Sequence, residues 1–120
     1  MGLRDAVRRL TKPPEDLDRE RLAEWCSHVG AVPIDEVVPR QRARVAGEVT
    51  AVRVVPRAGS PALEVTVDDG RRRITAVFLG RRRIGGMTNG RRLIIEGMAA
   101  REGRVLAIVN PEYELLPPAR

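Results

Sequence analysis

The sequence predicts a small all-β protein, a closed barrel of five strands preceded by one α-helix. From Arg42 onward, apolar residues alternate with polar ones in short runs, which is the two-residue period of a strand with one buried face. Glycine, proline and aspartate separate these runs at short intervals. The longest run contains Gly47, where a strand can bend sharply and so take part in two portions of a sheet. Five short strands, one of them bent, favour a small barrel over a sandwich of seven or more strands.

The chain divides into three parts. Its 120 residues suit one domain and leave no room for a catalytic domain beside a binding one. We assign residues 1–40 to an N-terminal tail, helix and connector, residues 41–116 to the barrel, and residues 117–120 to a C-terminal tail. Residues 1–12 have some helical spacing but are too few to be stable alone. We expect a frayed helix or a tail there, with a basic arm on nucleic acid as the alternative.

A helix is predicted from about residue 14 to residue 29. Proline suits the first helical turn, and the acidic residues that follow Pro14 lie where the helix dipole favours negative charge. Gly30 is a natural C-terminal cap. One apolar stripe runs along the helix, formed by Leu22, Trp25, Cys26 and Val29. Because Trp25 and Cys26 belong to this stripe, we expect them to pack the helix onto the barrel rather than to act as a stacking platform and a reactive thiol.

The remaining elements follow from the same patterns. The connector 31–40 is punctuated by prolines, and its apolar residues Ile34, Val37 and Val38 are expected to cover one end of the barrel. Apart from the turns that separate them, the five strands are expected at 43–55, 62–68, 71–79, 91–102 and 104–116, the last interrupted by Pro111.

The segments between the strands are predicted from their turn residues. Composition indicates a loop at 56–61 and a glycine-rich loop at 80–90 with at most one helical turn. Asp69-Gly70 is a strong hairpin signal, so strands two and three should pair directly. Glu102-Gly103 indicates a second tight turn, between strands four and five.

The positive charge is concentrated in the predicted barrel. The formal net charge is +6. Residues 1–39 carry six basic and eight acidic side chains, a net −2, whereas residues 40–104 carry fifteen and six, a net +9. Such a field favours polyanionic partners because it raises both the encounter rate and the affinity for phosphates. Lys12 is the single lysine, and a GC-rich genome would produce the same arginine bias without selection for binding.

The residues that would carry chemistry are absent or isolated. Cys26 and His28 are each alone, so the sequence offers no intramolecular disulfide and no metal site, and a cytoplasmic location is expected. Asp68 and Asp69 are adjacent, which favours a turn over an acid/base pair because neighbouring strand residues face opposite ways. No nucleotide-binding glycine motif follows a strand. We therefore expect no enzyme activity, no cofactor and no small-molecule substrate.

No membrane partner is expected. The N-terminal segment has no long apolar run, and nowhere do about 18 apolar residues occur together, as a membrane-spanning helix requires. The sequence therefore supports neither a signal peptide nor a membrane span.

Residues from about 42 to 116 resemble the OB-fold nucleic-acid-binding family, which includes anticodon-binding barrels and the wedge domain of RecG-type branch-migration helicases. The matching stretches are RVAGEVTAV, the VDDG hairpin leading into RRRITAVFLG, NGRRLIIEGMAAREG and the closing AIVNPEYELL. In the last of these, Asn110, Pro111 and Glu112 stand where the wedge domain has an HPE triplet. Small stand-alone OB proteins of actinobacteria, with a helix ahead of the barrel, look most similar. The chain departs from the pattern in lacking any helicase motor motif and in having few stacking aromatics.

The resemblance implies where a ligand would lie. OB folds usually bind across strands two and three, flanked by the loops between strands one and two and between strands four and five. The arginines at these positions, together with the triplet after strand three, are Arg53, Arg57, Arg71, Arg72, Arg73, Arg81, Arg82, Arg83, Arg101 and Arg104. Of the two triplets, we expect 71–73 to bind and 81–83 to be accessory. Phe78 is a candidate for base stacking, although alternation with Ile74 favours a place in the core.

The function expected from these features is binding without catalysis. We expect single-stranded or branched DNA or RNA on an arginine-rich face, with little sequence preference and strong salt dependence, since arginine neutralises phosphates and stacks on bases. The alternative is a protein-interaction module whose acidic N-terminal helix docks onto a larger nucleic-acid-processing complex.

Overall fold

The computed structural model describes residues 13–117, so the expected N-terminal segment 1–12 and most of the C-terminal tail lie outside the described residues. Its elements in chain order are the helix α2 (Pro14–Ser27), the short 3-10 helix η1 (Ile34–Glu36), and the strands β1 (Arg42–Arg57), β2 (Ser60–Asp68), β3 (Arg73–Leu79), β4 (Arg92–Glu102), β5 (Val105–Val109) and β6 (Glu112–Leu115). The prediction of a mainly β protein with one N-terminal α-helix is confirmed for this part of the chain.

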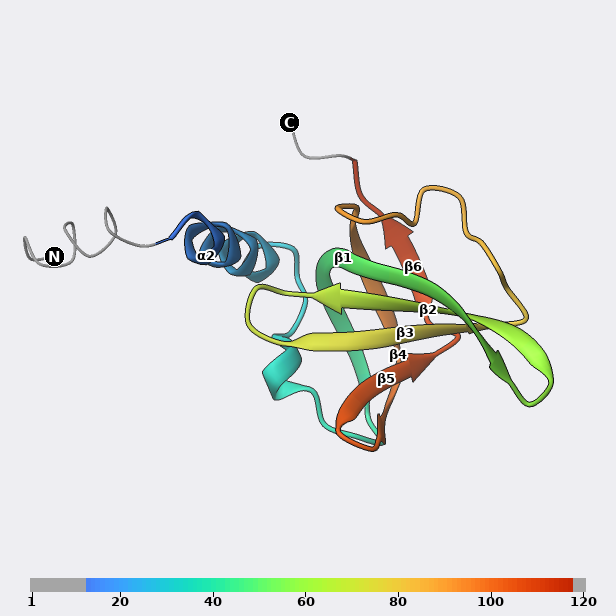
Figure 1. Cartoon of the computed structure of the whole chain (residues 1–120). Coiled ribbons are helices and arrows are strands. Elements are labelled where there is room, and N and C mark those ends of the chain that lie inside the picture. Colours follow the sequence, from blue (N-terminus) through green and yellow to red (C-terminus); the bar gives the residue numbers. More distant parts are fainter. Residues whose placement is uncertain (1–12, 118–120) are drawn as a thin grey trace, which may run out of the picture.

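The strands form one sheet that closes into a ring (Figure 1). Their order is β1-β2-β3-β5-β4-β6, and a further pairing between β1 and β4 completes the ring. The β3–β5 pair is parallel, whereas the other pairs are antiparallel.

The long strand β1 takes part in two portions of the sheet, as its glycine indicated. Its first half pairs with β4 and its second half with β2, and the two sets of partners meet at Glu48. A Cβ atom on Gly47 would lie 2.6 Å from the Asp68 carbonyl oxygen and from a Val67 methyl carbon. Glycine is therefore needed at this bend because no side chain fits between the two strands.

Two of the predicted element boundaries are wrong. The expected loop at 56–61 is a two-residue hairpin, because β1 continues to Arg57 and β2 begins at Ser60. Ala58 and Gly59 both have positive φ, 49° and 80°, which is the turn geometry that matches the twist of paired strands. The expected third strand begins at Arg73, so Arg71 and Arg72 belong to the preceding turn.

The expected fifth strand is two strands. β5 and β6 both pair with β4, and the chain between them slips by one residue relative to β4. Asn110 has a φ of 49°, and Pro111 has no N–H to donate to a ladder, which explains the break at this point. β2 and β4 lie within two residues of the prediction, and 80–90 is an irregular loop as expected.

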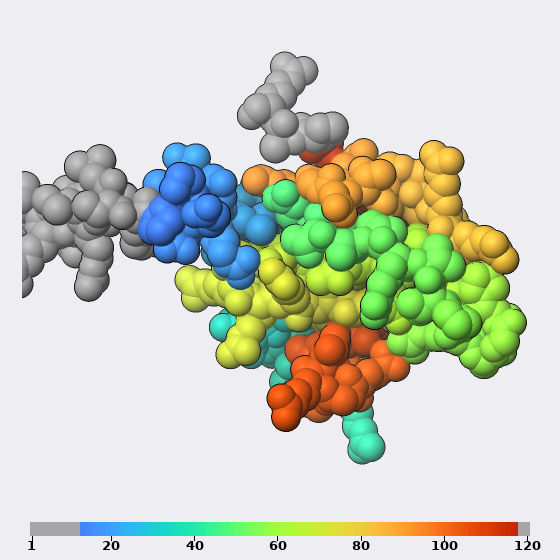
Figure 2. All heavy atoms as spheres, in the orientation of Figure 1, coloured from blue at the N-terminus to red at the C-terminus, as the bar shows by residue number. Residues whose placement is uncertain are grey.

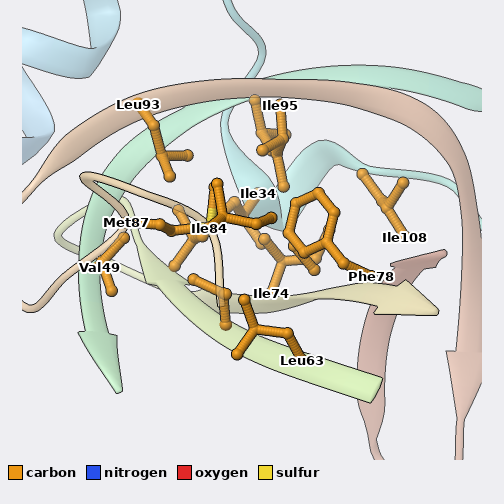
Figure 3. Close-up of a cluster of buried hydrophobic side chains, with 14 of the residues drawn as sticks. Ile34, Val49, Leu63, Ile74, Phe78, Ile84, Met87, Leu93, Ile95 and Ile108 are labelled. Atoms are coloured by element: carbon orange, nitrogen blue, oxygen red, sulfur yellow. The ribbon is translucent and has the colours of Figure 1, made fainter. Parts of the chain in front are cut away.

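The main core fills the ring, and it includes residues of two segments outside the strands, η1 and the loop after β3 (Figure 3). Ile34 of η1 is 1% exposed, and Ile84 and Met87 enter from the loop after β3. Val37 packs against this core, but Val38 is half exposed, so the expectation that it covers the barrel end is wrong. Phe78 is 5% exposed and meets the Tyr113 ring edge-on, with 5.6 Å between centroids. Its ring is therefore not available for stacking on a base.

The helix α2 is held against the ring by the predicted stripe. Leu22 is buried, the Cys26 thiol donates to the Ala46 carbonyl at 3.4 Å, and the Arg92 guanidinium lies 4.7 Å from the centre of the Trp25 ring. Burial raises the pKa of the Cys26 thiol to about 12, so the thiol stays protonated and unreactive near neutral pH. The packing roles expected for Trp25 and Cys26 are confirmed. No helix within residues 13–117 has both the length and the apolar composition needed to cross a membrane.

Candidate nucleic-acid interface

The turn between β2 and β3 fixes the position of the first arginine triplet. The Asp69 side chain is buried, and its Oδ1 accepts hydrogen bonds from the Arg71 and Arg72 N–H groups, both at 2.9 Å. Its Oδ2 accepts from the Ile34 N–H, also at 2.9 Å. One carboxylate therefore holds the turn and attaches η1 to it, which explains why an ionisable group is buried here.

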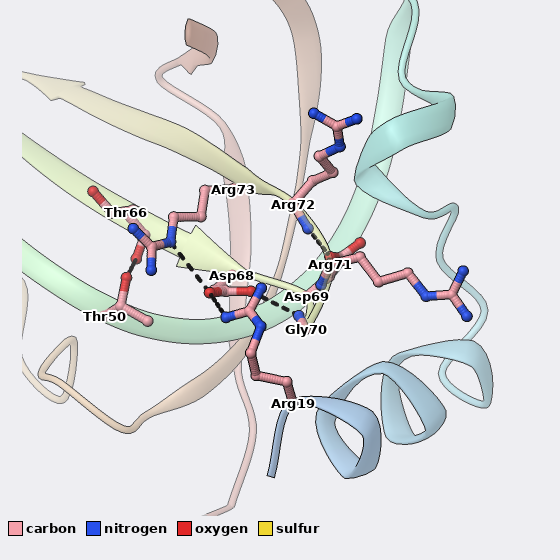
Figure 4. Close-up of polar contacts among 9 residues, drawn as sticks. All are labelled: Arg19, Thr50, Thr66, Asp68, Asp69, Gly70, Arg71, Arg72 and Arg73. Carbon is pink, nitrogen blue, oxygen red and sulfur yellow. Dashed lines mark hydrogen bonds and ion pairs between the residues drawn. The ribbon is translucent and has the colours of Figure 1, made fainter. Parts of the chain in front are cut away.

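Its neighbour Asp68 joins the same turn to the helix α2. Asp68 Oδ2 accepts from Arg19 at 2.8 Å and from Arg73 at 3.2 Å, and Oδ1 accepts from the Gly70 N–H at 2.7 Å (Figure 4). Burial alone would raise the pKa of Asp68, but the hydrogen bonds from Arg19, Gly70 and Arg73 together lower it below its ordinary value. The aspartates thus form a turn, as predicted, and also anchor two N-terminal elements.

Gly70 allows the helix to approach this turn. It has a φ of 94°, and a Cβ atom there would lie 2.4 Å from the Arg19 carbonyl oxygen and 2.8 Å from the Ala23 nitrogen. Glycine is thus required both by the backbone conformation and by the contact with α2.

The side chains of the first triplet, residues 71–73, do not form one cluster. In Figure 4 the side chains of Arg71, Arg72 and Arg73 leave the turn in three directions. Arg71 lines a small cavity beside α2, together with Cys26 and Val32. Arg73 extends over the carboxylate of Asp68, and Arg72 points away from the helix.

Two hairpins bring four of the predicted arginines to one pocket of about 430 Å³. Arg72 and Arg73 come from the β2–β3 turn, and Arg101 and Arg104 come from the β4–β5 hairpin. We call the site that these four residues line the arginine pocket. Figure 2 shows the orange-red β4–β5 hairpin beside the turquoise segment that contains η1. The other lining residues are Ile34, Asp35, Val37, Val105 and Leu106.

Most of the charge in the arginine pocket is not compensated by neighbouring acids. Within residues 13–117, Arg72, Arg101 and Arg104 form no ion pair, and Arg73 shares Asp68 with Arg19. Among residues 13–117, Asp35 is the one acidic side chain that lines the pocket. An anion that enters therefore meets several guanidinium groups that have no competing carboxylate partner.

The arginines of β1 are in a different situation. Arg53 donates to Glu64 at 3.0 Å, and Arg57 donates to both carboxylate oxygens of Glu102 at 3.1 and 3.0 Å. Arg57 Nη2 also lies 3.4 Å from Glu64 Oε2. We call the contact among Glu64, Arg57 and Glu102 the Arg57 bridge. These hydrogen bonds raise the pKa of Arg57 and lower the pKa of Glu102, so both groups are charged and paired.

The second triplet lies at the other end of β3 from the arginine pocket. Arg81, Arg82 and Arg83 are exposed on the loop after β3, and within residues 13–117 they form no ion pair. Arg82 and Arg83 line a separate pocket of about 310 Å³ with Leu63, Ile84 and Met87. The structure therefore does not bring the two triplets together.

Sequence reasoning missed the acidic partners. Glu64 forms an ion pair with Arg53, and Glu102 forms one with Arg57. Arg19 joins α2 to the β2–β3 turn through its ion pair with Asp68. For Glu64 a signal existed, because the hairpin register places it directly opposite Arg53. For the Arg57–Glu102 pair there was none, since 45 residues separate the two in the chain.

Comparison with known proteins gives no match to a family model and no match to a curated protein. Within residues 13–117, no three His, Cys, Asp or Glu side chains gather where they could hold a metal ion.

Proposed function

We propose that this protein is a non-enzymatic OB-fold protein that binds single-stranded or branched nucleic acid through the arginine pocket, with little sequence preference. The observation that carries the proposal is the convergence of Arg72, Arg73, Arg101 and Arg104 from two separate hairpins on one pocket. Three of these arginines, Arg72, Arg101 and Arg104, have no carboxylate partner within residues 13–117, and such guanidinium groups are suited to phosphate groups because they bind them in a bidentate manner.

The strand order supports the OB-fold part of the proposal. Five strands in the order β1-β2-β3-β5-β4, closed by the β1–β4 pair, form a small ring with one parallel pair. An OB-fold is a five-stranded, partly open barrel of this size with the loop between strands four and five at its ligand site. In this chain that loop is the β4–β5 hairpin, which supplies Arg101 and Arg104 to the pocket.

Weak sequence preference follows from the residues available. Phosphate contacts carry no base information, and specific recognition needs side chains that read base edges or stack on splayed bases. Phe78 is buried and Trp25 has Arg92 over its ring. Tyr113 is 41% exposed but lies beside Glu112 and Glu114 and does not line the arginine pocket. Arginine stacking is therefore the main way to contact bases in that pocket. A cytoplasmic location belongs to the proposal as well, and it is supported by the lone, protonated thiol of Cys26.

The proposal is tested by fluorescence anisotropy with labelled single-stranded DNA and RNA over a salt series. If four arginines contact phosphates, the logarithm of the affinity should fall with the logarithm of the salt concentration with a slope of about −3, from about −0.7 per contact. The double variant Arg72→Gln, Arg104→Gln should bind at least about tenfold more weakly and show a slope reduced by about 1.4.

The matched control is the double variant Arg81→Gln, Arg83→Gln, which removes the same charge from the other end of β3. It should retain most of the affinity, and both variants should keep the wild-type melting temperature because the four arginines have no ion pairs within the described residues. Absence of binding at low salt, or equal losses in the two variants, would refute the assignment of binding to the arginine pocket.

A second candidate function is a protein-interaction module, and one observation favours it. The exposed surface of α2 is acidic, with Glu15, Asp16, Asp18 and Glu24 exposed around the helix. Glu15, Asp16 and Glu24 are replaced by their amides, and capture of a protein partner from a nuclease-treated lysate is measured. Capture should be lost if the partner binds α2. Capture should be unchanged if the partner binds the ring of strands.

A further inference from the structure

We infer that the arginine pocket binds the phosphorylated end of a nucleic-acid strand, a terminal phosphomonoester, rather than the interior of the strand. This inference rests on the proposed function and specifies its ligand. It follows from the size of the pocket, from the residues that close it, from its charge, and from the Arg57 bridge on the neighbouring face of the sheet.

The pocket is the size of a small-molecule site. Its volume of about 430 Å³ lies within the range of roughly 300–1,000 Å³ that is usual for such sites. OB folds that bind the interior of a strand contact roughly 4–16 nucleotides, which needs an extended groove. The arginines of this pocket are instead gathered where about one nucleotide fits.

The pocket ends on the hydrophobic core. Ile34 belongs to the main core, and Val37 and Leu106 pack against it. Because these residues also line the pocket, a strand that enters cannot continue through the ring. Their apolar surface suits the face of a sugar or base, while the arginines lie around it.

The charge of the pocket exceeds that of one internal phosphate. Arg72, Arg101 and Arg104 have no ion pair within residues 13–117, and Asp35 is the acidic residue beside them. An internal phosphodiester carries one negative charge, whereas a terminal phosphomonoester carries about −1.5 to −2 at neutral pH and offers three acceptor oxygens. A strand end thus compensates these arginines better than one internal phosphate does.

The usual path of a continuous strand is obstructed. Glu64 lies on β2 and Glu102 on β4, and two strands stand between them, so a flat sheet would separate the two strands by about 14 Å. Arg57 Nη2 nevertheless contacts both carboxylates, at 3.4 and 3.0 Å. The Arg57 bridge therefore spans the outer face of β3 and β5.

The residues on that outer face are buried. Ala62, Val77 and Ala107 alternate with core residues and so face outward, yet each is at most 1% exposed, and together they form a second apolar cluster. Val55, two residues before Arg57 on β1, packs against this cluster. A strand crossing this face would have to displace the Arg57 bridge, whose one guanidinium and two carboxylates carry a net charge of −1. A strand end reaches the arginine pocket without crossing it.

The test compares strand ends in one sequence of about 12 nucleotides, labelled at an internal thymine. Four forms are titrated by anisotropy: 5′-phosphorylated, 3′-phosphorylated, hydroxyl at both ends, and covalently circular. One phosphorylated form should bind about tenfold more tightly than the hydroxyl-ended and circular forms, because the monoester gains charge-assisted hydrogen bonds. Adenosine monophosphate is added as a competitor, since a free nucleotide supplies the same phosphomonoester, and it should displace the phosphorylated strand at higher concentration.

The variant Arg72→Gln, Arg104→Gln should lose the preference for the phosphorylated end, and Arg81→Gln, Arg83→Gln should retain it. If the circular and hydroxyl-ended strands bind as tightly as the phosphorylated ones, the inference is overturned while nucleic-acid binding stands. If no form binds at low salt, the proposed function fails and the inference fails with it.

Discussion

The β2–β3 turn and the β1–β2 hairpin are both rich in arginine and both contain acidic residues nearby, but their acids have different partners. At the β2–β3 turn, Asp69 accepts hydrogen bonds from backbone N–H groups, and Asp68 is shared among Arg19, Arg73 and Gly70. On β1, Arg53 and Arg57 meet Glu64 and Glu102 directly. Arg72 remains available for a ligand because the Asp69 carboxylate is occupied by backbone N–H groups and the Asp68 carboxylate by Arg19, Arg73 and the Gly70 N–H. The count of charges does not reveal this difference, whereas the hydrogen-bond partners do.

The largest effect expected from this comparison is on folding, at the glycines of the two hairpins. Gly70→Ala should lower the free energy of unfolding by about 2 kcal/mol or more, because the new methyl group combines a strained positive φ with contacts to the backbone of α2. Gly59→Ala is the matched control: its φ of 80° is similar, but no atom of residues 13–117 outside the turn itself lies within 4 Å of the added carbon. It should cost about 1 kcal/mol.

The two glycine variants are compared by urea unfolding and by fluorescence. Trp25 is the only tryptophan and packs beneath Arg92, so its emission reports whether α2 is docked. Gly70→Ala should shift this emission toward longer wavelength, and Gly59→Ala should not. Equal destabilisation by the two substitutions would show that the contact between the turn and α2 contributes little.

An intermediate effect is expected on the pH dependence of stability. The folded pKa of Asp68 lies below its unfolded value, so its contribution to the free energy of unfolding is fully present above about pH 4 and is lost as the pH falls through the folded pKa. Asp68→Asn should therefore lower the free energy of unfolding near neutral pH. It should also make the free energy of unfolding less dependent on pH in the acid range.

Urea unfolding from about pH 3 to about pH 6 measures this dependence. Glu102→Gln serves as the control, because the pKa of Glu102 is also lowered but its ion pair with Arg57 is solvent-exposed and contributes little to stability. If Asp68→Asn and Glu102→Gln reduce the pH dependence of the unfolding free energy to the same extent, the buried Asp68 carboxylate contributes no more to stability than the exposed Arg57–Glu102 pair.

Local sequence patterns predicted most of the elements, because these depend on neighbouring residues. The stripe of α2, the alternation in β2 and the bend at Gly47 are all set by short-range periodicity or by the absence of a side chain. The hairpin at Ala58-Gly59 was missed because its flanking prolines are typical of loops. In the structure, Pro56 and Pro61 lie opposite each other and extend the paired strands.

The candidate site was predictable only in part, because it depends on how distant segments meet. The resemblance to OB folds indicated the hairpins that carry Arg72 and Arg104, and the structure places both residues on one pocket. Which arginines are paired was not predictable, since Arg57 meets Glu102 only after the ring has closed. The attachment of η1 to Asp69 likewise joins residues 35 positions apart.

The smallest effect is expected at the Arg57 bridge, and it tests whether the acids of that region limit binding. Glu102→Gln should remove the closer of the two carboxylate partners of Arg57, leaving Glu64 at 3.4 Å, and should remove a carboxylate from the hairpin that carries Arg101 and Arg104. Affinity for single-stranded DNA should then rise by about two- to fivefold, with a salt slope steeper by about 0.7, the value for one additional phosphate contact.

Two further variants decide the cause of such a gain. Glu112→Gln makes the same change in net charge on β6, where Glu112 pairs with Arg42, and it should leave binding almost unchanged. In the background of Glu102→Gln, Arg57→Gln should abolish the gain, because the added contact comes from the Arg57 guanidinium. A gain of equal size in Glu112→Gln would mean that net charge alone governs affinity, and the distinction between paired and unpaired arginines would then have no bearing on binding.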